Sequence, residues 1–253
     1  MKQGIFTTIT TIAALIIANV FYWGVLPGLD KGSDVTPIIH QIRLGGVLVP
    51  FLITITLMLL TFVAERIFTL KKAQGNAPLP VFFSEYTQAV REGRFEDATA
   101  LCDKQRGSAA AVLRAGTEQY LRTKSDKGMT GEKRLSETQR AINEARLLEV
   151  PFLERNLIAL STIASIATMV GLLGTTVGMI RSFAAMATQG APNAAQLAQG
   201  ISEALVNTAL GLFAAIIGIV AYNFFVNKVD QFNYNVDEAA YLTLEILKEK
   251  EAA

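Results

Sequence analysis

Long uncharged apolar runs alternate with charged stretches along this chain. Four such runs occupy residues 5–26, 45–64, 156–180 and 204–227, and each holds at least 20 residues. A helix rises about 1.5 Å per residue, so about 20 apolar residues cross a hydrocarbon layer of roughly 30 Å. The pattern therefore predicts an all-α membrane protein with four transmembrane helices.

The first run has two interpretations, a retained helix or a cleaved signal peptide. Its 22 residues are long for the apolar part of a signal peptide, and Lys2 is the only charge before them. Tyr22 and Trp23 stand at its far end, where interfacial aromatic residues belong, and no A-x-A cleavage site follows. We interpret the run as a retained helix followed by a polar connector.

Basic residues flank one end of each later run. They are Arg66, Lys71, Lys72, Arg155 and Lys228. The connector at 187–199, by contrast, carries no charge. Because positive charges stay on the cytoplasmic side, we expect residues 69–155, the C-terminal segment and both termini in the cytoplasm, and the connector outside.

The segment between the second and third runs is dense in charge. Gly75, Pro78 and Pro80 interrupt the chain before it, and amphipathic stretches follow. The spacing predicts helices at 81–91, 94–104 and 109–122, a mobile loop at 123–133 and a charged helix at 132–155. This segment is expected to form a helical cytoplasmic domain.

Five domains follow from these patterns. They are the first helix with a periplasmic connector (1–44), the second helix (45–68), the cytoplasmic domain (69–155), the third and fourth helices (156–227) and a cytoplasmic C-terminal helix (228–253). The C-terminal helix is expected to continue the fourth span.

Small residues recur every three or four positions in the last two runs. In the third run they are Ser161, Ala164, Thr168, Gly171, Thr175, Gly178 and Ser182, and in the fourth Ala204, Thr208, Gly211, Ala215 and Gly218. Such a face lets helix backbones approach closely, which explains the glycines, and Gly174 lies beside it. Its threonines could also present hydroxyl groups to water in a pore. Periodicity leaves both explanations open.

Composition excludes several classes of protein. With 51% hydrophobic and 18% charged residues and a mean hydropathy of +0.35, the chain is typical of a membrane protein. A net charge of +1 gives no electrostatic basis for binding nucleic acid. One histidine, His40, expected in a solvated loop, and one cysteine, Cys102, expected as a small buried apolar residue, cannot form a Cys/His metal cage. We find no enzyme motif and expect no cofactor and no metal.

Two segments carry a resemblance to a known family. GLLGTTVGMIRSF at 171–183 and GISEALVNTALGLFAAIIGIVAYNFF at 200–225 resemble the paired signature segments of the ExbB/TolQ/MotA family of proton-channel subunits, most closely ExbB. REGRFEDATALC at 91–102 resembles a segment of the family's cytoplasmic domain. The first span lies outside the family's usual three-helix plan, and Thr176 and Val177 replace a valine and a large aromatic residue.

The resemblance implies a homopentamer in the bacterial inner membrane, with the third and fourth helices forming the channel core. It also implies an ExbD-like single-span partner that supplies a transmembrane aspartate, and a TonB-like protein as a further partner. Such complexes couple inward proton flow to work at the periplasm or outer membrane. Thr175 and Thr208 match the family's pore-lining threonines, and Glu203 matches its motif glutamate. The alternatives are a TolQ-like or motor stator subunit and a non-conducting membrane scaffold.

The residues themselves add one constraint on mechanism. No Asp, Glu, His, Lys or Arg lies within the four apolar runs, so the chain alone is an incomplete proton path and a partner must supply the carboxylate. Glu203 and Thr208 are about 140° apart on a helix, so they cannot both face a narrow lumen. We expect the two threonines to line the pore, and Glu203 to collect protons or to pair with a neighbouring subunit.

Overall fold

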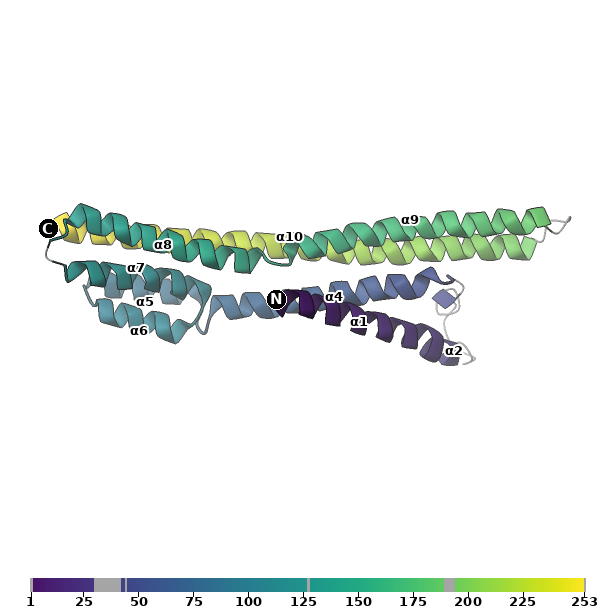
Figure 1. Ribbon diagram of the computed structural model, residues 1–253, viewed down its shortest axis with the longest axis horizontal. Coiled ribbons are helices and arrows are strands. Elements are labelled where there is room, and N and C mark those ends of the chain that lie inside the picture. Colours follow the sequence, from purple (N-terminus) through teal and green to yellow (C-terminus); the bar gives the residue numbers. More distant parts are fainter. Residues whose placement is uncertain (1, 30–41, 44, 127, 189–193, 253) are drawn as a thin grey trace. The chain divides into compact units, whose positions relative to one another are not determined.

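The computed structural model describes residues 2–29, 42–43, 45–126, 128–188 and 194–252, and every regular element among them is a helix (Figure 1). The chain divides into two compact units. The first comprises Met1–Ala64 and Asn156–Asn223, and the second comprises Glu65–Arg155 and Phe224–Ala253. His40 and most of the predicted periplasmic connector lie outside the described residues.

The first unit holds the first three apolar runs and most of the fourth. Its helices are α1 (Lys2–Val20), the π-helix η1 (Phe21–Val25), α2 (Leu26–Leu29), the N-terminal part of α4 (Leu48–Gln74), α9 (Leu157–Thr188) and the N-terminal part of α10 (Ala194–Ala252). In the described part of the chain, four helical segments are long and apolar enough to cross a membrane, and each overlaps one predicted run. Large side chains such as Ile158, Ile180 and Ile216 are exposed on them, as a lipid-facing surface requires. The prediction of four membrane-capable helices is confirmed.

The ends of these helices differ from the ends of the predicted runs. The second run begins at Gly45 in the sequence, but α4 begins at Leu48 because Gly46 adopts a positive φ of 73° in a turn. The predicted connector at 187–199 is shorter, since α9 reaches Thr188 and α10 begins at Ala194. As predicted, the fourth span continues into the C-terminal segment, and α10 is one helix of 59 residues.

The second unit is a helical bundle. It contains α5 (Leu79–Arg91), α6 (Phe95–Gln105), α7 (Ser108–Lys124), α8 (Gly131–Glu154), and the C-terminal parts of α4 and α10. The helices predicted in this segment are confirmed, with ends shifted by up to two residues, and the predicted loop shortens to the stretch between Lys124 and Gly131. The regions predicted as separate domains at 69–155 and 228–253 belong to this one unit, which begins at Glu65.

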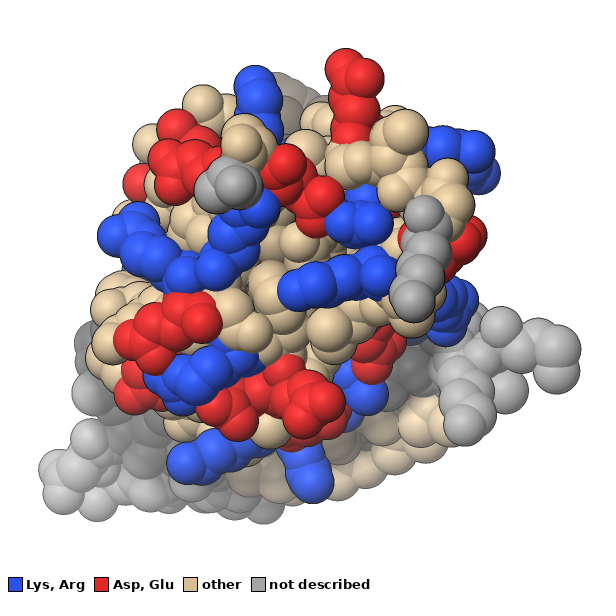
Figure 2. All heavy atoms as spheres, turned by 90° about the vertical axis from the view of Figure 1, so that its left-hand side faces the viewer, with Lys and Arg blue, Asp and Glu red and all other residues tan. Residues whose placement is uncertain are grey.

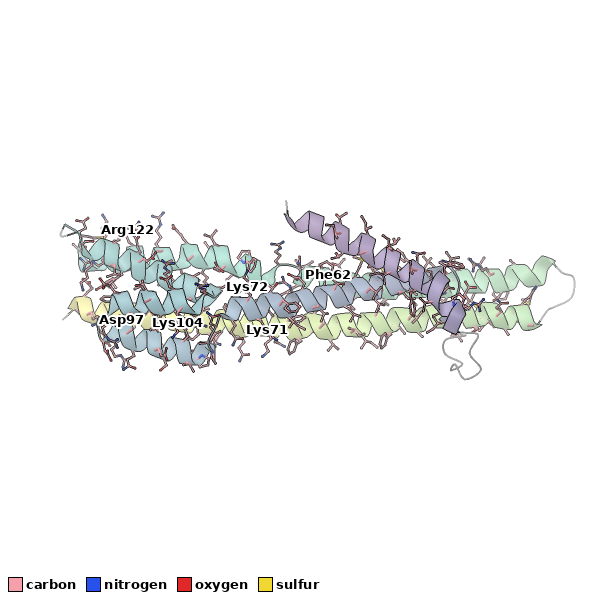
Figure 3. All side chains as sticks on the ribbon, turned by 90° about the horizontal axis from the view of Figure 1, so that it is seen from below. Phe62, Lys71, Lys72, Asp97, Lys104 and Arg122 are labelled. Carbon is pink, nitrogen blue, oxygen red and sulfur yellow. The ribbon has the colours of Figure 1, made fainter. Side chains whose placement is uncertain are left out.

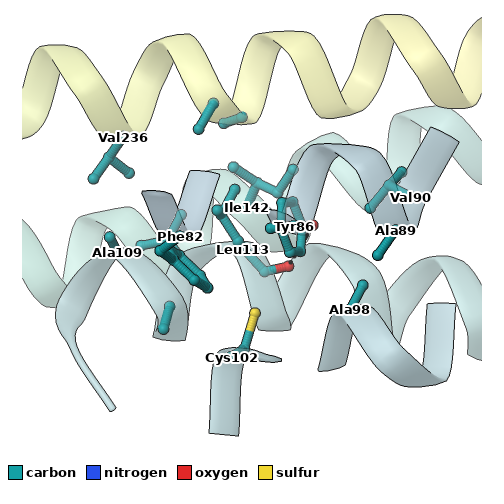
Figure 4. Packing of buried hydrophobic residues seen from close by; sticks show 14 of the residues in the cluster. Phe82, Tyr86, Ala89, Val90, Ala98, Cys102, Ala109, Leu113, Ile142 and Val236 are labelled. Carbon is teal, nitrogen blue, oxygen red and sulfur yellow. Dashed lines mark hydrogen bonds between the residues drawn. The ribbon is translucent and has the colours of Figure 1, made fainter. Parts of the chain in front are cut away.

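An apolar core holds the second unit together (Figure 4). Phe82 and Tyr86 of α5, Leu113 of α7 and Ile142 of α8 meet there, and Val236 brings in α10. The Tyr86 hydroxyl donates to the carbonyl oxygen of Leu113 and lies 2.6 Å from the Thr117 hydroxyl. Burial raises the pKa of the Tyr86 phenol above its ordinary value, so the ring stays neutral.

One glutamine fixes the turn from α4 to α5. The side chain of Gln105, 3% exposed at the end of α6, donates from Nε2 to the carbonyl oxygens of Gln74 and Ala77, and its Oε1 accepts from the Ala77 amide. The chain turns there because Gly75 has a φ of 85°, where a Cβ would overlap the Gln105 backbone. The predicted break at Gly75 is therefore an ordered turn that the Gln105 side chain holds in place.

The surface of the second unit is mixed in charge, as its sequence indicates. On the face seen in Figure 2, basic and acidic side chains are interspersed. Arg146 pairs with Asp237 of α10, and near the end of α10 Glu251 accepts hydrogen bonds from Arg134 and Tyr120 at 2.6 to 2.7 Å. The hydrogen bond from Tyr120 and the charge of Arg134 lower the pKa of the Glu251 carboxyl. These contacts tie the C-terminal half of α10 to α7 and α8.

Candidate functional site

The helices α9 and α10 form an antiparallel pair in the first unit (Figure 1). Their contacts run in opposite directions along the two helices, in the pairs Gly178 with Ala204, Gly174 with Asn207, Gly171 with Gly211 and Ala164 with Gly218. The two motif segments therefore lie against each other within one chain.

The glycines set how closely these helices approach. Gly171, Gly174, Gly178, Gly211 and Gly218 all lie in the contact. A Cβ on Gly178 would be 2.8 Å from the carbonyl oxygen of Gly200, and one on Gly211 would be 2.6 Å from that of Ala167. A larger side chain at either position meets backbone, which cannot move aside, so close packing within the subunit requires these glycines.

The two candidate pore threonines lie at one edge of the pair. Both side chains are half-buried. Thr208 Oγ1 donates to the carbonyl oxygen of Gly171 at 3.1 Å, and Thr175, one turn along α9 from Gly171, donates to Leu172 at 2.6 Å. The structure therefore brings Thr175 and Thr208 to neighbouring levels, with each hydroxyl hydrogen engaged by a backbone carbonyl and oxygen lone pairs left to accept.

Glu203 is separated from the threonines and forms an ion pair. It is 8% exposed, and its Oε1 accepts from Nη1 of Arg181 at 2.5 Å, while the Arg181 side chain is 52% exposed. The pair joins α9 to α10 within one chain. Glu203 is thus a buried carboxylate that is paired within the chain, and its role in collecting protons or in contacting a neighbouring subunit stays a prediction.

A backbone turn closes over this ion pair. Gly46 has a positive φ, and a Cβ on it would overlap the Glu203 carboxylate. Asn207 Nδ2 donates to the carbonyl oxygen of Gly45 at 3.0 Å, and Tyr22 of η1 donates to that of Arg43 at 2.9 Å. The turn before α4 is therefore held from two sides, by α10 and by the additional N-terminal helix.

Sequence reasoning did not assign a role to Arg181, Gly46 or Tyr22 at this site. The sequence did hold a signal for Arg181, because Arg181 directly follows the third run and Glu203 directly precedes the fourth. A short connector between two antiparallel helices places their joined ends side by side. Asn207 lies one helical turn after Glu203, but the sequence does not indicate its hydrogen bond to Gly45. No local pattern marks Gly46 or Tyr22, since their contacts are to residues far away in the sequence.

The chemistry that the described residues support is limited. Between Leu157 and Ile180, and between Ala204 and Asn227, the chain has hydroxyl and amide groups but no titratable carboxylate, imidazole or amine. Among the described residues, no three or more His, Cys, Asp and Glu side chains form a group that could hold a metal ion. Cys102 is buried, and that burial raises the pKa of its thiol to about 12, which confirms it as a small buried side chain rather than a reactive thiolate.

Comparison with known families assigns the chain that carries this helix pair to a family. A family model described as the MotA/TolQ/ExbB proton channel family matches residues 105–238, more than half of the chain, and includes both motif segments. The chain belongs to the MotA/TolQ/ExbB proton channel family. Family membership and four membrane-capable helices together mark it as a membrane protein.

The relatives of this family member carry more than one name. It is 39% identical over 114 residues to the Tol-Pal system protein TolQ of Pseudomonas aeruginosa, covering 45% of this chain and 49% of that protein. It is 44% identical over 81 residues to the biopolymer transport protein ExbB of Pseudomonas putida, covering 32% and 25%. A putative ExbB homolog of Methanothermobacter thermautotrophicus is 27% identical over 193 residues, covering 76% and 64%. The matched part spans about half the length of the TolQ relative.

The Arg181–Glu203 pair leads to a prediction about stability. Arg181→Leu leaves the Glu203 carboxylate buried without its partner, and should lower the free energy of unfolding by about 3 kcal/mol. Glu203→Gln leaves an arginine that reaches water, and should cost about 1 kcal/mol. The measurement is thermal unfolding of each purified variant in detergent. The double variant R181L/E203L serves as the control and should be more stable than R181L alone, whereas additive losses would contradict a coupled pair.

Proposed function

We propose that this chain is an ExbB-like inner-membrane subunit of a complex that is driven by the proton-motive force. In this proposal, inward proton flow through the complex is coupled to work at the periplasm or outer membrane. The observation that carries the proposal is the family match over an antiparallel helix pair that has hydroxyl groups at one edge and no carboxylate, imidazole or amine along its apolar length.

The proposed assembly is a homopentamer whose α9 and α10 helices surround a central pore. Copies arranged in a ring can place the half-buried edge with Thr175 and Thr208 toward a lumen, while exposed residues such as Ile180 and Ile216 face lipid. Both termini are proposed to be cytoplasmic. The basic residues beside the spans, such as Arg66, Arg155 and Lys228, mark the cytoplasmic side of the membrane, and four spans return the chain to the side on which it began.

The missing carboxylate is proposed to come from a partner. Proton transfer across a bilayer core needs a titratable relay or a chain of waters, and the apolar runs supply no Asp, Glu, His, Lys or Arg. An ExbD-like single-span protein with one transmembrane aspartate would complete the path, and a TonB-like protein would receive the work. A drop of about 150 to 200 mV supplies roughly 3.5 to 4.6 kcal/mol per proton, enough to drive a repacking step.

The threonine hydroxyls have a defined part in this mechanism. Each donates its hydrogen to a backbone carbonyl, so the oxygen is oriented and keeps lone pairs that can accept from water. Waters held there beside the partner's carboxylate would shorten each proton hop. Hydrogen bonds from those waters would also stabilise the ionised carboxylate.

A non-conducting membrane scaffold is the second candidate. The same observation favours it, because hydroxyl hydrogens that are already bonded to the backbone fit a face that serves helix packing alone. A TolQ-like or motor stator subunit would share the channel chemistry and differ in the system that is driven.

Proton flux in liposomes tests the proposed function. The chain reconstituted alone should conduct few protons under an imposed gradient, as followed with a pH-sensitive dye. Co-reconstitution with a single-span partner that carries one membrane-edge aspartate should raise the flux, and replacing that aspartate by asparagine should remove the increase. Strong flux from the chain alone would contradict the need for an external carboxylate, and no flux with the partner would favour the scaffold.

A further inference from the structure

A groove in the second unit combines basic and apolar side chains. Its volume is about 570 Å³, and the C-terminal part of α4, the start of α5 and α10 form its walls. Ile67, Leu70 and Phe224 line its apolar side, and Lys71 and Lys228 line its basic side. Figure 3 labels Lys71 and its neighbour Lys72 on α4, and Lys72 borders a different hollow beside Cys102.

The two lysines carry charge that the described part of the chain does not neutralise. Both side chains are exposed, and neither forms an ion pair with a described residue. Lys228 Nζ lies 5.9 Å from the centre of the Phe224 ring, which orients the ammonium group but does not cancel its charge. No carboxylate is among the described residues that line the groove, whereas the amides of Gln231 and Asn235 add neutral donors. The groove therefore suits a ligand with a negative charge.

The apolar wall defines the rest of that ligand. Ile67 and Phe224 are large apolar side chains, and they are 42% and 55% exposed. Ile67 lies three residues after the run that ends at Ala64, and Phe224 lies in the last turn of the run that ends at Asn227. Both positions are therefore where a span meets the headgroup layer. A soluble phosphate or nucleotide would leave this apolar wall in water.

We propose that this groove binds an anionic phospholipid, with its phosphate between Lys71 and Lys228 and an acyl chain against Ile67 and Phe224. Each lysine near a membrane surface contributes about 1 kcal/mol to the attraction of an anionic lipid. Two lysines therefore give a preference for an anionic over a zwitterionic headgroup on the order of tenfold. The site would fasten the junction of α4, α5 and α10 to the lipid leaflet.

Competitive lipid retention tests the proposal. The full chain is placed in nanodiscs with equal amounts of phosphatidylglycerol and phosphatidylcholine and then extracted into detergent, and the lipids that remain bound are quantified by mass spectrometry. The wild type should retain phosphatidylglycerol over phosphatidylcholine by on the order of tenfold, and K71Q/K228Q should bring the ratio close to one. The matched control K72Q/K248Q removes two exposed lysines outside the groove and should leave the ratio unchanged.

Three results would overturn the proposal. They are equal phosphatidylglycerol retention in the wild type and K71Q/K228Q, an equal loss in the control variant, and a changed oligomeric mass of K71Q/K228Q with unchanged lipid retention. The last result would assign the groove to a second copy of this chain. Thermal unfolding of each variant, expected to match the wild type, shows that a lost preference does not reflect misfolding.

Discussion

Replacing Gly178 by leucine should separate α9 from α10 and destabilise the first unit by about 4 kcal/mol or more. The first added carbon would already lie 2.8 Å from the carbonyl oxygen of Gly200 and 2.9 Å from Cβ of Ala204. Neither atom is the end of a flexible side chain, so the whole helix must move. That movement would also break the neighbouring contacts of Gly171 and Gly174, which depend on the same helix spacing.

Thermal unfolding in detergent and native mass measurement check this prediction. Gly178→Leu should unfold at a clearly lower temperature than the wild type and should fail to assemble into the proposed pentamer. Ile180→Leu is the matched control, because Ile180 is 66% exposed two residues along the same helix and the change conserves volume. A Gly178→Leu protein with wild-type stability and an intact oligomer would show that the glycine contacts do not set the packing.

Removing both threonine hydroxyls should abolish proton-driven activity. Thr175→Val together with Thr208→Val keeps nearly the same volume but removes the oxygens that would hold water beside the partner's carboxylate. We expect proton flux through the complex with its partner to fall by roughly two orders of magnitude, the scale that a lost positioned proton-transfer group produces. Thr→Ser at both positions restores the hydroxyl and should retain much of the flux.

The control for this prediction is the adjacent threonine. Thr176 is exposed and donates to the carbonyl oxygen of Leu173, so Thr176→Val removes a hydroxyl from the same helix turn on a different face. Its flux should match the wild type, and all variants should assemble as judged by native mass. Full flux in the double valine variant would show that Thr175 and Thr208 serve packing alone and would support the scaffold.

The small-residue stripe shows how far a helical pattern reaches. Counting by threes and fours selected Gly171 and Gly178, which are buried, but also Thr168 and Thr175, which lie at the edge. The residues directly before these two threonines, Ala167 and Gly174, are the buried ones. Each step along a helix turns by about 100°, so two adjacent lines of small residues are equally good candidates for one face. Only the position of α10 decides which line is covered.

The sequence by itself determined the helices and the class of protein. Apolar runs, helical spacing and turn residues act within a few positions of one another. The four membrane-capable helices were therefore predicted, and α5, α6, α7 and α8 of the second unit were predicted to within two residues of their ends. The paired motifs at 171–183 and 200–225 likewise indicated the family from the residue types within each segment.

The tertiary structure alone decided what those residues touch. The burial of Glu203, its pairing with Arg181 and the joining of the 228–253 segment to the bundle of the second unit all depend on contacts between distant positions. A local pattern shows which face of a helix carries small or apolar side chains, but it does not show which other helix packs against that face. Whether a charge at the end of a span is solvated or buried against a partner is therefore settled only when the helices pack.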